Sequence, residues 1–356
     1  MGRFTNMKLR YSYSVVCLSL FTGFLIGRMR AGGSAARACP ASEMYPAGGV
    51  WTPATAPRGE GNDALRRLLK QVAVRDEVLV AVSNRNLLRE TGAGGPGSYD
   101  GMLRLWVDSV KRAGVRNAVI VALDEETRTA AIAMDVACWR VEPLALADAN
   151  QDNHGTSAQK FHILRQFLAL GYRVLLSDVD VVVVQNPFQH LHRDADVEAL
   201  SDGYDPRTAY GYVDGLDDPS MGWSRYVQTM RIYVLNSGLF YIQPSARTLH
   251  LMDRITQHLV ANKDWDQSVF NMMLWYPSHG EERNSQASVR VMHHLLFMNS
   301  RTLFVHFRKE PQYAEHTPVM VHVNYHADKE HRVRAIHRRY LDREADALDE
   351  LPDASL

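Results

Sequence analysis

Cysteine is scarce in this chain, and its three cysteines, Cys17, Cys39 and Cys138, are not spaced as a zinc site or a disulfide framework would require. A surplus of one charge is also absent, because 40 Lys and Arg residues balance 40 Asp and Glu residues. That balance gives no basic bias towards nucleic acid. No internal repeat runs along the 356 residues, and this length favours one large α/β domain or two smaller ones.

A long apolar run occurs near the N-terminus, over residues 11–27, and it is short for a membrane-spanning helix. Arg28 and Arg30 follow at the place where a signal peptide would have a small-residue cleavage site. A retained signal anchor is therefore favoured over a cleaved signal peptide or a soluble helix. The predicted organisation is a cytosolic tail over 1–10, a transmembrane helix over 11–27, a flexible luminal stem over 28–63 and a folded domain over 64–356.

The folded domain is organised around residues 174–187, in which apolar and β-branched side chains flank Asp178 and Asp180. Such a run is typical of a strand that is buried on both faces. Two carboxylates with one residue between them, at the end of a strand, can direct their oxygens at one place. Oxygen ligands suit magnesium, manganese or calcium. A divalent-metal site is the favoured interpretation, and the alternative is a strand that ends in two solvated acids.

Strands and helices alternate along the chain before this segment. The predicted strands are 77–83, 118–123 and 136–141, and the predicted helices are 99–112, 127–134 and 156–170. This order predicts an α/β fold with a largely parallel sheet covered on both faces, in which ligands bind outside the carboxyl ends of the strands. Ser83 ends the first strand and Asn84 follows it, so both fall at the same edge as Asp178 and Asp180.

Several polar residues outside the central strand allow both a structural and a functional interpretation. Lys160 is either an ordinary surface lysine or a charge that faces a diphosphate. His322, on a predicted strand over 319–323, is either a core histidine or a third metal ligand. Asp266 and Gln267 begin a predicted helix, so they either cap it or present a carboxylate and an amide to a bound sugar.

Aromatic residues are prominent in the second half of the domain. Residues 204–223 form an irregular segment rich in Gly, Tyr, Asp and Pro, and their aromatic side chains argue against disorder. Trp223, Trp265 and Trp275 either belong to the core or stack on a sugar ring. A charged stretch over 332–348 predicts a helical tail with a solvated face.

Eight short motifs occur in order along this domain. They are Leu-Leu-Ser-Asp-Val-Asp-Val-Val at 175–182, Gln-Asn-Pro-Phe at 185–188, Asp-Val-Glu-Ala-Leu-Ser-Asp-Gly at 196–203, Ala-Tyr-Gly-Tyr at 209–212, Met-Gly-Trp at 221–223, Asn-Ser-Gly-Leu-Phe-Tyr at 236–241, Trp-Asp-Gln at 265–267 and His-Val-Asn-Tyr-His at 322–326. The Asp-x-Asp alone is a weak signal, whereas the ordered set is specific. Together they resemble the nucleotide-diphospho-sugar transferases of glycosyltransferase family 77, over about Val78 to Pro352.

The resemblance implies a fold and a metal site. The fold would be of the GT-A type, with a mainly parallel, Rossmann-like sheet between helices, and the protein would be a single-pass type II protein of the Golgi membrane. The cofactor would be manganese, or magnesium in its place. Asp178, Asp180 and His322 would bind it, with His326 as the second choice for the histidine.

The resemblance also implies substrate contacts. Asn236, Asp266 and Gln267 would act as catalytic residues near the anomeric carbon of the donor sugar. The implied substrate-binding residues are Ser83 and Asn84 at the uridine, Lys160 and Asp178 at the diphosphate, Ser237 and Gly238 beside the donor, and Trp223 in an acceptor platform over 204–223. Retention of configuration would proceed either through a covalent carboxylate intermediate or by attack on the same face of the sugar.

The activity that the resemblance implies is transfer of L-arabinofuranose from its UDP donor to arabinosylated hydroxyproline of extensin-like glycoproteins. The partners would be a UDP-sugar, a hydroxyproline-rich glycoprotein and the membrane, but no nucleic acid. A UDP-xylose or UDP-galactose transferase of the same family is the first alternative. A haloacid-dehalogenase-like phosphohydrolase, whose nucleophile strand the Asp-x-Asp also resembles, and a non-catalytic glycan-binding protein are the others.

Overall fold

The computed structural model describes residues 49–57, 62–88, 99–144, 153–215, 229–232 and 234–353, and the folded unit extends over Tyr45–Leu356. The predicted cytosolic tail, the predicted anchor over 11–27, most of the predicted stem and Trp223 lie outside the described residues. Within the described ranges, no helix is both long enough and apolar enough to cross a bilayer. Trp51, in the predicted stem, donates its N–H to the Pro244 carbonyl over 2.7 Å and packs against the domain core.

The helices and strands follow one another in a largely alternating order. The helices are α1 Asp63–Val72, α2 Met102–Arg112, α3 Glu125–Ala133, α4 Asn153–Ala169, α5 Pro206–Ala209, α6 Ala246–Ala261, α7 Asp266–Trp275 and α8 Lys329–Ile336. The strands are β1 Glu77–Ser83, β2 Ala118–Ala122, β3 Ala137–Arg140, β4 Arg173–Ser177, β5 Val181–Val183, β6 Val197–Ser201, β7 Tyr212–Gly215, β8 Thr229–Ile232, β9 Leu235–Ile242, β10 Val289–Val291, β11 Phe297–Asn299 and β12 Met320–His322.

The main sheet has seven strands in the order β10-β6-β9-β4-β1-β2-β3. Neighbouring strands are parallel except at β9, which runs antiparallel to both β4 and β6. The prediction of a mainly parallel sheet in an α/β fold is therefore confirmed. The carboxyl ends of the parallel strands meet at one edge of this sheet, and the start of β9 joins them there.

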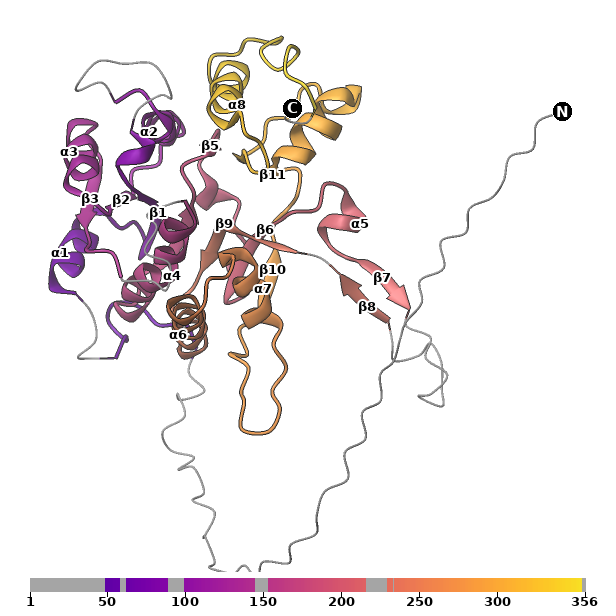
Figure 1. Cartoon of the computed structure of the whole chain (residues 1–356). Helices are drawn as coiled ribbons and strands as arrows, with labels where there is room; N and C mark the ends of the chain where they lie inside the picture. Colours follow the sequence, from indigo (N-terminus) through magenta and orange to yellow (C-terminus); the bar gives the residue numbers. More distant parts are fainter. Residues whose placement is uncertain are drawn as a thin grey trace, which may run out of the picture. The chain divides into compact units, whose positions relative to one another are not determined.

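Each face of the sheet carries its own hydrophobic core. Successive side chains of a strand point to opposite faces, so that Val78 and Val80 of β1 belong to one core while Leu79 and Ala81 belong to the other. The first core contains side chains of α1, α4, α6 and α7, and Figure 1 shows the last three of these helices in front of the sheet. The second core contains side chains of α2, α3 and α8.

The predicted central strand over 174–187 is divided in two. β4 ends at Ser177, the chain turns through Asp178 and Asp180, and β5 joins a separate three-stranded sheet in the order β11-β12-β5. The apolar run extends across both strands because both are buried, β4 within the seven-stranded sheet and β5 at one edge of the three-stranded sheet. The acidic residues therefore lie between two sheets, at the carboxyl end of β4, rather than at the end of one long strand.

Several predicted element boundaries differ from the structure. α4 begins at Asn153, three residues before its predicted start at 156. Ser245 caps α6, with its side chain accepting from the Thr248 N–H. Gly171 follows α4 with φ of +83°, a conformation that glycine adopts freely at the end of a helix.

The predicted charged tail is only partly solvated. It begins earlier than predicted, with α8 at Lys329, and the Arg332 side chain is fully buried. The Arg332 guanidinium lies 4.5 Å from the ring of Phe304, and its Nε donates to Asp328 over 2.9 Å. One face of this helix is therefore part of the domain interior.

Candidate active site

Pairing between β12 and β5 explains how three potential metal ligands come together from distant parts of the chain. His322, the last residue of β12, is the partner of Val181 at the start of β5, directly after Asp180. The Val323 N–H donates to the Asp180 carbonyl over 2.9 Å, which fixes this register. Potential ligand atoms of Asp178, Asp180 and His322 all lie within 4.8 Å of one another.

The geometry of this acidic cluster leaves potential ligand atoms incompletely hydrogen-bonded. Nε2 of His322 lies 3.2 Å from Oδ1 of Asp180, and both side chains are buried. Among the described residues, Nδ1 of His322 is buried and has no hydrogen-bond partner, and Oδ1 of Asp180 has only Nε2 of that same ring nearby. Buried polar atoms are normally hydrogen-bonded, so an exception at a set of converging carboxylates points to an ion that completes the site.

Burial and neighbouring charges set the protonation of the two aspartates. Burial alone would raise the pKa of Asp180, but His322 and Lys329 hold it well below its usual range. Burial raises the pKa of Asp178, an effect that Lys160 opposes and Asp180 reinforces. Asp180 is therefore the carboxylate that stays ionised, and Asp178 gains most from a nearby cation.

Lys329 is a member of the cluster that the sequence analysis missed. Its Nζ lies 2.7 Å from Oδ2 of Asp180, the carboxylate oxygen that does not face His322. The side chain is 43% exposed, so its ammonium remains accessible to a ligand. Nothing in the sequence singles out Lys329, because it lies just before a charged stretch, and such a stretch normally indicates a solvated face.

A second ion pair borders the first. Lys160 of α4 is buried, and its Nζ lies 2.7 Å from Oδ2 of Asp266 and 3.7 Å from Oδ1 of Asp178. The alternative of an ordinary surface lysine is therefore wrong. The Ser237 hydroxyl also donates to Oδ2 of Asp266, over 2.9 Å. Burial would raise the pKa of Asp266, but Lys160 and Ser237 hold it below its usual range.

Asp202 is the centre of a third group of polar contacts and was not assigned a role from the sequence. It follows β6 directly, and its N–H donates to the Val234 carbonyl over 3.0 Å, which brings it beside the start of β9. Its Oδ1 accepts from Asn236 over 2.8 Å and from Asn324 over 3.2 Å. Its Oδ2 accepts from Gln267 over 2.7 Å. Asp202 thus joins β6, β9, α7 and the loop after β12.

Gly238 is placed where a side chain would displace two of the potential metal ligands. Its carbonyl accepts from the Asp178 N–H over 2.7 Å. A Cβ at this position would lie 2.5 Å from Oδ2 of Asp178 and 2.6 Å from Cε1 of His322. Glycine therefore lets β9 approach the acidic cluster closely enough to carry Asn236 and Ser237 alongside it.

The residues predicted at the uridine lie at the same edge. Ser83 is the last residue of β1, which pairs directly with β4, and Asn84 follows it. The Asn84 side chain accepts from the Asn86 N–H over 3.1 Å and so begins a short turn of 3₁₀ helix. β1 and β4 therefore bring these two residues and the acidic cluster to adjacent strand ends.

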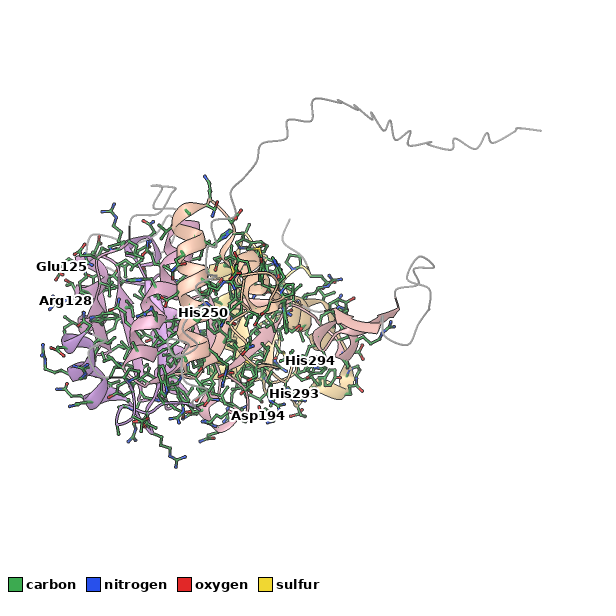
Figure 2. All side chains as sticks on the ribbon, turned by 90° about the horizontal axis from the view of Figure 1, so that it is seen from below. Glu125, Arg128, Asp194, His250, His293 and His294 are labelled. Carbon is green, nitrogen blue, oxygen red and sulfur yellow. The ribbon has the colours of Figure 1, made fainter. Side chains whose placement is uncertain are left out.

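The described part of the predicted acceptor platform uses its aromatic rings internally. Tyr204 stacks on His306 with ring centroids 4.3 Å apart, and the Arg301 guanidinium lies 4.2 Å from the same ring. Tyr210 bonds through its hydroxyl to the N–H of His294 over 3.1 Å. Figure 2 labels His293 and His294 on the side of the molecule that carries the β7–β8 ribbon, away from Glu125 and Arg128 of α3.

A hollow of about 200 Å³ opens beside this segment. Tyr204, His294, His306 and Tyr313 contribute rings to its wall, and Glu310 contributes a carboxylate. The Thr302 hydroxyl in the same wall donates to the Gly203 carbonyl over 3.4 Å. Tyr204, in the wall of the hollow, is separated from Asp202 by one residue, Gly203.

The charges at this edge match the needs of a diphosphate. Three buried or partly buried carboxylates, Asp178, Asp180 and Asp266, outnumber the ammonium groups of Lys160 and Lys329. With Asp202 beside them, these groups are net negative, and a bound divalent cation would cancel that excess of negative charge. An arrangement that attracts a cation first and an anionic diphosphate second is suited to a metal-assisted transfer of a diphosphate-linked group.

Residues 113–335 match the family described as nucleotide-diphospho-sugar transferase. Arabinosyltransferase RRA2 of Arabidopsis thaliana is 45% identical over 306 residues, which cover 85% of this chain and 69% of that protein. Arabinosyltransferase RRA1 of the same plant is 42% identical over 306 residues, which cover 85% and 73%. Among solved structures, the glycosyltransferase GlyE of Streptococcus pneumoniae TIGR4 is 12% identical with a TM-score of 0.38, over 69% of this chain and 54% of that one.

The structural similarity is too low to carry an argument, whereas the sequence matches cover most of the chain. They confirm the resemblance that the eight motifs indicated. The same sequence matches exclude the two alternatives of a phosphohydrolase and a non-catalytic glycan-binding protein. The chain belongs to the nucleotide-diphospho-sugar transferase family and is a glycosyltransferase.

Proposed function

We propose that this glycosyltransferase moves L-arabinofuranose from UDP-L-arabinofuranose to arabinose already attached to hydroxyproline of an extensin-like glycoprotein, with retention of configuration. The observation that carries the proposal is the 45% identity to an arabinosyltransferase over 85% of the chain, together with the converging ligands at the end of β4. We further propose a GT-A fold and a type II Golgi membrane protein, anchored by residues 11–27, with the domain in the lumen.

The donor set fits a divalent cation. Two carboxylates, from Asp178 and Asp180, favour magnesium or manganese, whereas the imidazole of His322 favours a transition metal. Manganese satisfies both preferences. When bound there, the cation would act as a Lewis acid that neutralises the charge developing on the leaving diphosphate.

The lysines of this chain would share the task of holding the diphosphate. Lys329 is bonded to Asp180 and half exposed, so its ammonium can turn towards a phosphate oxygen once a cation neutralises that carboxylate. Lys160 is held rigidly by Asp266 and faces Asp178. Fixed positive charges around a leaving group stabilise the transition state without reorganisation.

The two carboxylates that would not bind the cation, those of Asp266 and Asp202, would position and stabilise the groups around the sugar. Asp266 shares its Oδ2 between Lys160 and Ser237, so it acts by positioning those two groups. Asp202, with Asn236 and Gln267 bonded to it, presents a negative, amide-lined surface beside the metal site. A nearby negative charge stabilises an oxocarbenium-like transition state, as in glycoside hydrolysis.

The proposal is tested by a donor screen with the full-length protein and manganese. UDP-L-arabinofuranose, UDP-xylose and UDP-galactose are each supplied with an arabinosylated hydroxyproline peptide, and product mass is measured. Addition of one pentose from the arabinofuranose donor, abolished by EDTA and restored by manganese, is the expected result. Consumption of only UDP-xylose or UDP-galactose would overturn the arabinose assignment and leave the metal site intact.

A further inference from the structure

Tyr325 has a backbone conformation that is unfavourable for its residue type. Its φ is +63°, in the left-handed region that glycine adopts freely and that L side chains rarely occupy. It lies three residues after His322, in the loop that follows β12. Strained residues of this kind persist where the surrounding structure holds them, and they concentrate at functional sites.

The Tyr325 side chain is anchored by its hydroxyl and open at its ring. The hydroxyl is hydrogen-bonded to Asp202, the carboxylate that also accepts from Asn236 and Gln267. Burial of the hydroxyl and the charge of Asp202 raise the pKa of Tyr325 well above its usual range. The residue is nevertheless 58% exposed. The hydroxyl end of Tyr325 is therefore held beside Asp202, Asn236 and Gln267, while much of its ring remains exposed to solvent.

Trp265 is a second exposed aromatic residue, next to Asp266 in the chain. It precedes Asp266 as the N-cap residue of α7, makes no side-chain capping bond and is 50% exposed, so the core alternative for this residue is wrong. It lies two residues from Gln267, which donates to Asp202. Tyr325 is thus connected to the Asp202–Gln267 pair by a hydrogen bond, and Trp265 is connected to it through the chain.

An exposed aromatic face beside fixed hydrogen-bonding groups is suited to a sugar ring. The apolar face of a sugar packs on the flat face of tyrosine or tryptophan, while its hydroxyls reach the polar groups at the edge. The diphosphate end of the donor is already accounted for by Lys160, Lys329 and the metal ligands. The described part of the segment 204–223 offers little free ring surface, because Tyr204 packs against His306 and Arg301.

We propose that Tyr325 and Trp265 form the subsite for the acceptor sugar, with Tyr325 as the positioning residue that directs an acceptor hydroxyl towards Asp202 and Gln267. This inference rests on the proposed function for the presence of a donor, but not on the identity of the pentose. The chemical class of the ligand is a neutral saccharide at the end of a longer glycan.

The backbone of Tyr325 makes a discriminating variant available. Tyr325→Gly removes the ring and places at φ +63° the residue that adopts this conformation without strain. Loss of the hydroxyl bond and relief of strain oppose each other, so Tm is expected to stay within about 3 °C of wild type. Tyr325→Phe keeps the ring and removes the hydroxyl that bonds to Asp202 and Gln267.

Acceptor affinity is measured by calorimetry with full-length protein, UDP, manganese and an arabinosylated hydroxyproline peptide as the probe. Tyr325→Gly and Trp265→Ala are expected to weaken binding at least about tenfold, and Tyr325→Phe by less than about threefold. The matched control is Trp275→Ala, which removes a tryptophan of similar exposure, 47%, from the other end of α7 and should leave binding unchanged. Equal weakening in Trp275→Ala, or none in Tyr325→Gly, overturns the proposal.

Donor hydrolysis in the absence of acceptor separates this proposal from the proposed function. Tyr325→Gly is expected to change acceptor affinity at least tenfold more than it changes manganese-dependent release of UDP from the donor. If wild type transfers no pentose in the donor screen but still binds the glycan through Tyr325, the proposed function fails and the saccharide subsite stands. A loss of donor hydrolysis as large as the loss of acceptor affinity would instead make Tyr325 a structural support of the donor site.

Discussion

The two edges of the seven-stranded sheet carry buried charges in opposite ways. At the amino ends of the strands, Glu77 accepts from Arg193 over 2.7 and 3.0 Å and from the Tyr241 hydroxyl over 2.7 Å. Asp196 at the same edge accepts from the Arg247 guanidinium and from both the hydroxyl and the N–H of Ser288. Neither carboxylate has a buried oxygen without a partner among the described residues.

At the carboxyl ends of the strands, the corresponding groups are left incomplete. Among the described residues, Nδ1 of His322 is buried without a hydrogen-bond partner, and Oδ1 of Asp180 has only Nε2 of the same ring nearby, at 3.2 Å. The two edges have the same strands, similar burial and similar residue types, so composition does not distinguish them. The edges differ in whether their buried polar groups are fully hydrogen-bonded to one another. At the closed edge, the amino ends of the strands, they are, and the network stabilises the fold. At the open edge, the carboxyl ends, they are not, and such a site is suited to binding a ligand.

The largest expected effect is on catalysis at the open edge. Asp180→Asn removes the carboxylate that stays ionised and should lower kcat/KM at least about 1000-fold, because a metal ligand and its charge are lost together. The Tm without metal should change little, since Lys329, its partner, is 43% exposed and regains water. Initial rates with UDP-L-arabinofuranose and thermal unfolding measure the two quantities. Near-normal activity in this variant would place the metal elsewhere.

The next effect is on stability at the closed edge. Glu77→Gln leaves the Arg193 guanidinium and the Tyr241 hydroxyl facing a neutral amide, and the free energy of unfolding should fall by about 3 kcal/mol. Urea unfolding followed by circular dichroism measures this. Manganese should raise the Tm of the variant as much as it raises that of wild type. A variant as stable as wild type, or one that no longer responds to manganese, would remove the distinction between the edges.

A smaller effect is expected from crowding the open edge without removing a charge. Gly238→Ala places a methyl group 2.5 Å from Oδ2 of Asp178 and 2.6 Å from Cε1 of His322, which must both shift. Manganese affinity should fall about 10- to 100-fold, as it does when ligand orientation is disturbed. Gly49→Ala is the control, because a Cβ there meets nothing within 4 Å. Unaltered manganese affinity in Gly238→Ala would show that β9 does not restrain the ligands.

The smallest effect concerns a buried group that belongs to neither edge. Burial lowers the pKa of His337 to about 4, below the value near 6.5 of an unfolded chain. The folded state therefore holds this histidine neutral, and its contribution to stability is complete above pH 6.5 and lost as pH falls towards 4. Between pH 7 and 5, wild type should lose about 1 to 2 kcal/mol more than His337→Gln. Parallel pH profiles of unfolding free energy for the two proteins would refute this.

The sequence located the open edge because its signal is local. An apolar, β-branched run interrupted by Asp178 and Asp180 indicates a buried strand end with acids, and the alternation of strands and helices indicates a parallel sheet around it. A functional role was one of two alternatives for Lys160, which lies in the helix before the central strand, and for His322, which lies in another predicted strand. The division of the central run into β4 and β5 was not foreseen, because both halves are equally apolar.

Residues that complete the site through long-range pairing were missed. Asp202 meets Asn236 across 34 positions and Gln267 across 65, and Lys329 meets Asp180 across 149. Nothing adjacent to Asp202 or Lys329 in the sequence distinguishes them from a turn aspartate and a surface lysine. The pairing of β12 with β5 and of β6 with β9 selects these partners, and a single sequence does not reveal strand order.

The central claim, that the open edge binds a divalent cation through Asp178, Asp180 and His322, is tested most directly by manganese titration followed by electron paramagnetic resonance. His326 is the internal control, because its ring packs against Phe304 and its Nδ1 lies 4.0 Å from Asp328 rather than in the cluster. Wild type and His326→Ala should bind one manganese ion per chain with similar affinity, and His322→Ala should bind at least about tenfold more weakly. Equal affinity in the two variants, or the greater loss in His326→Ala, would contradict the account.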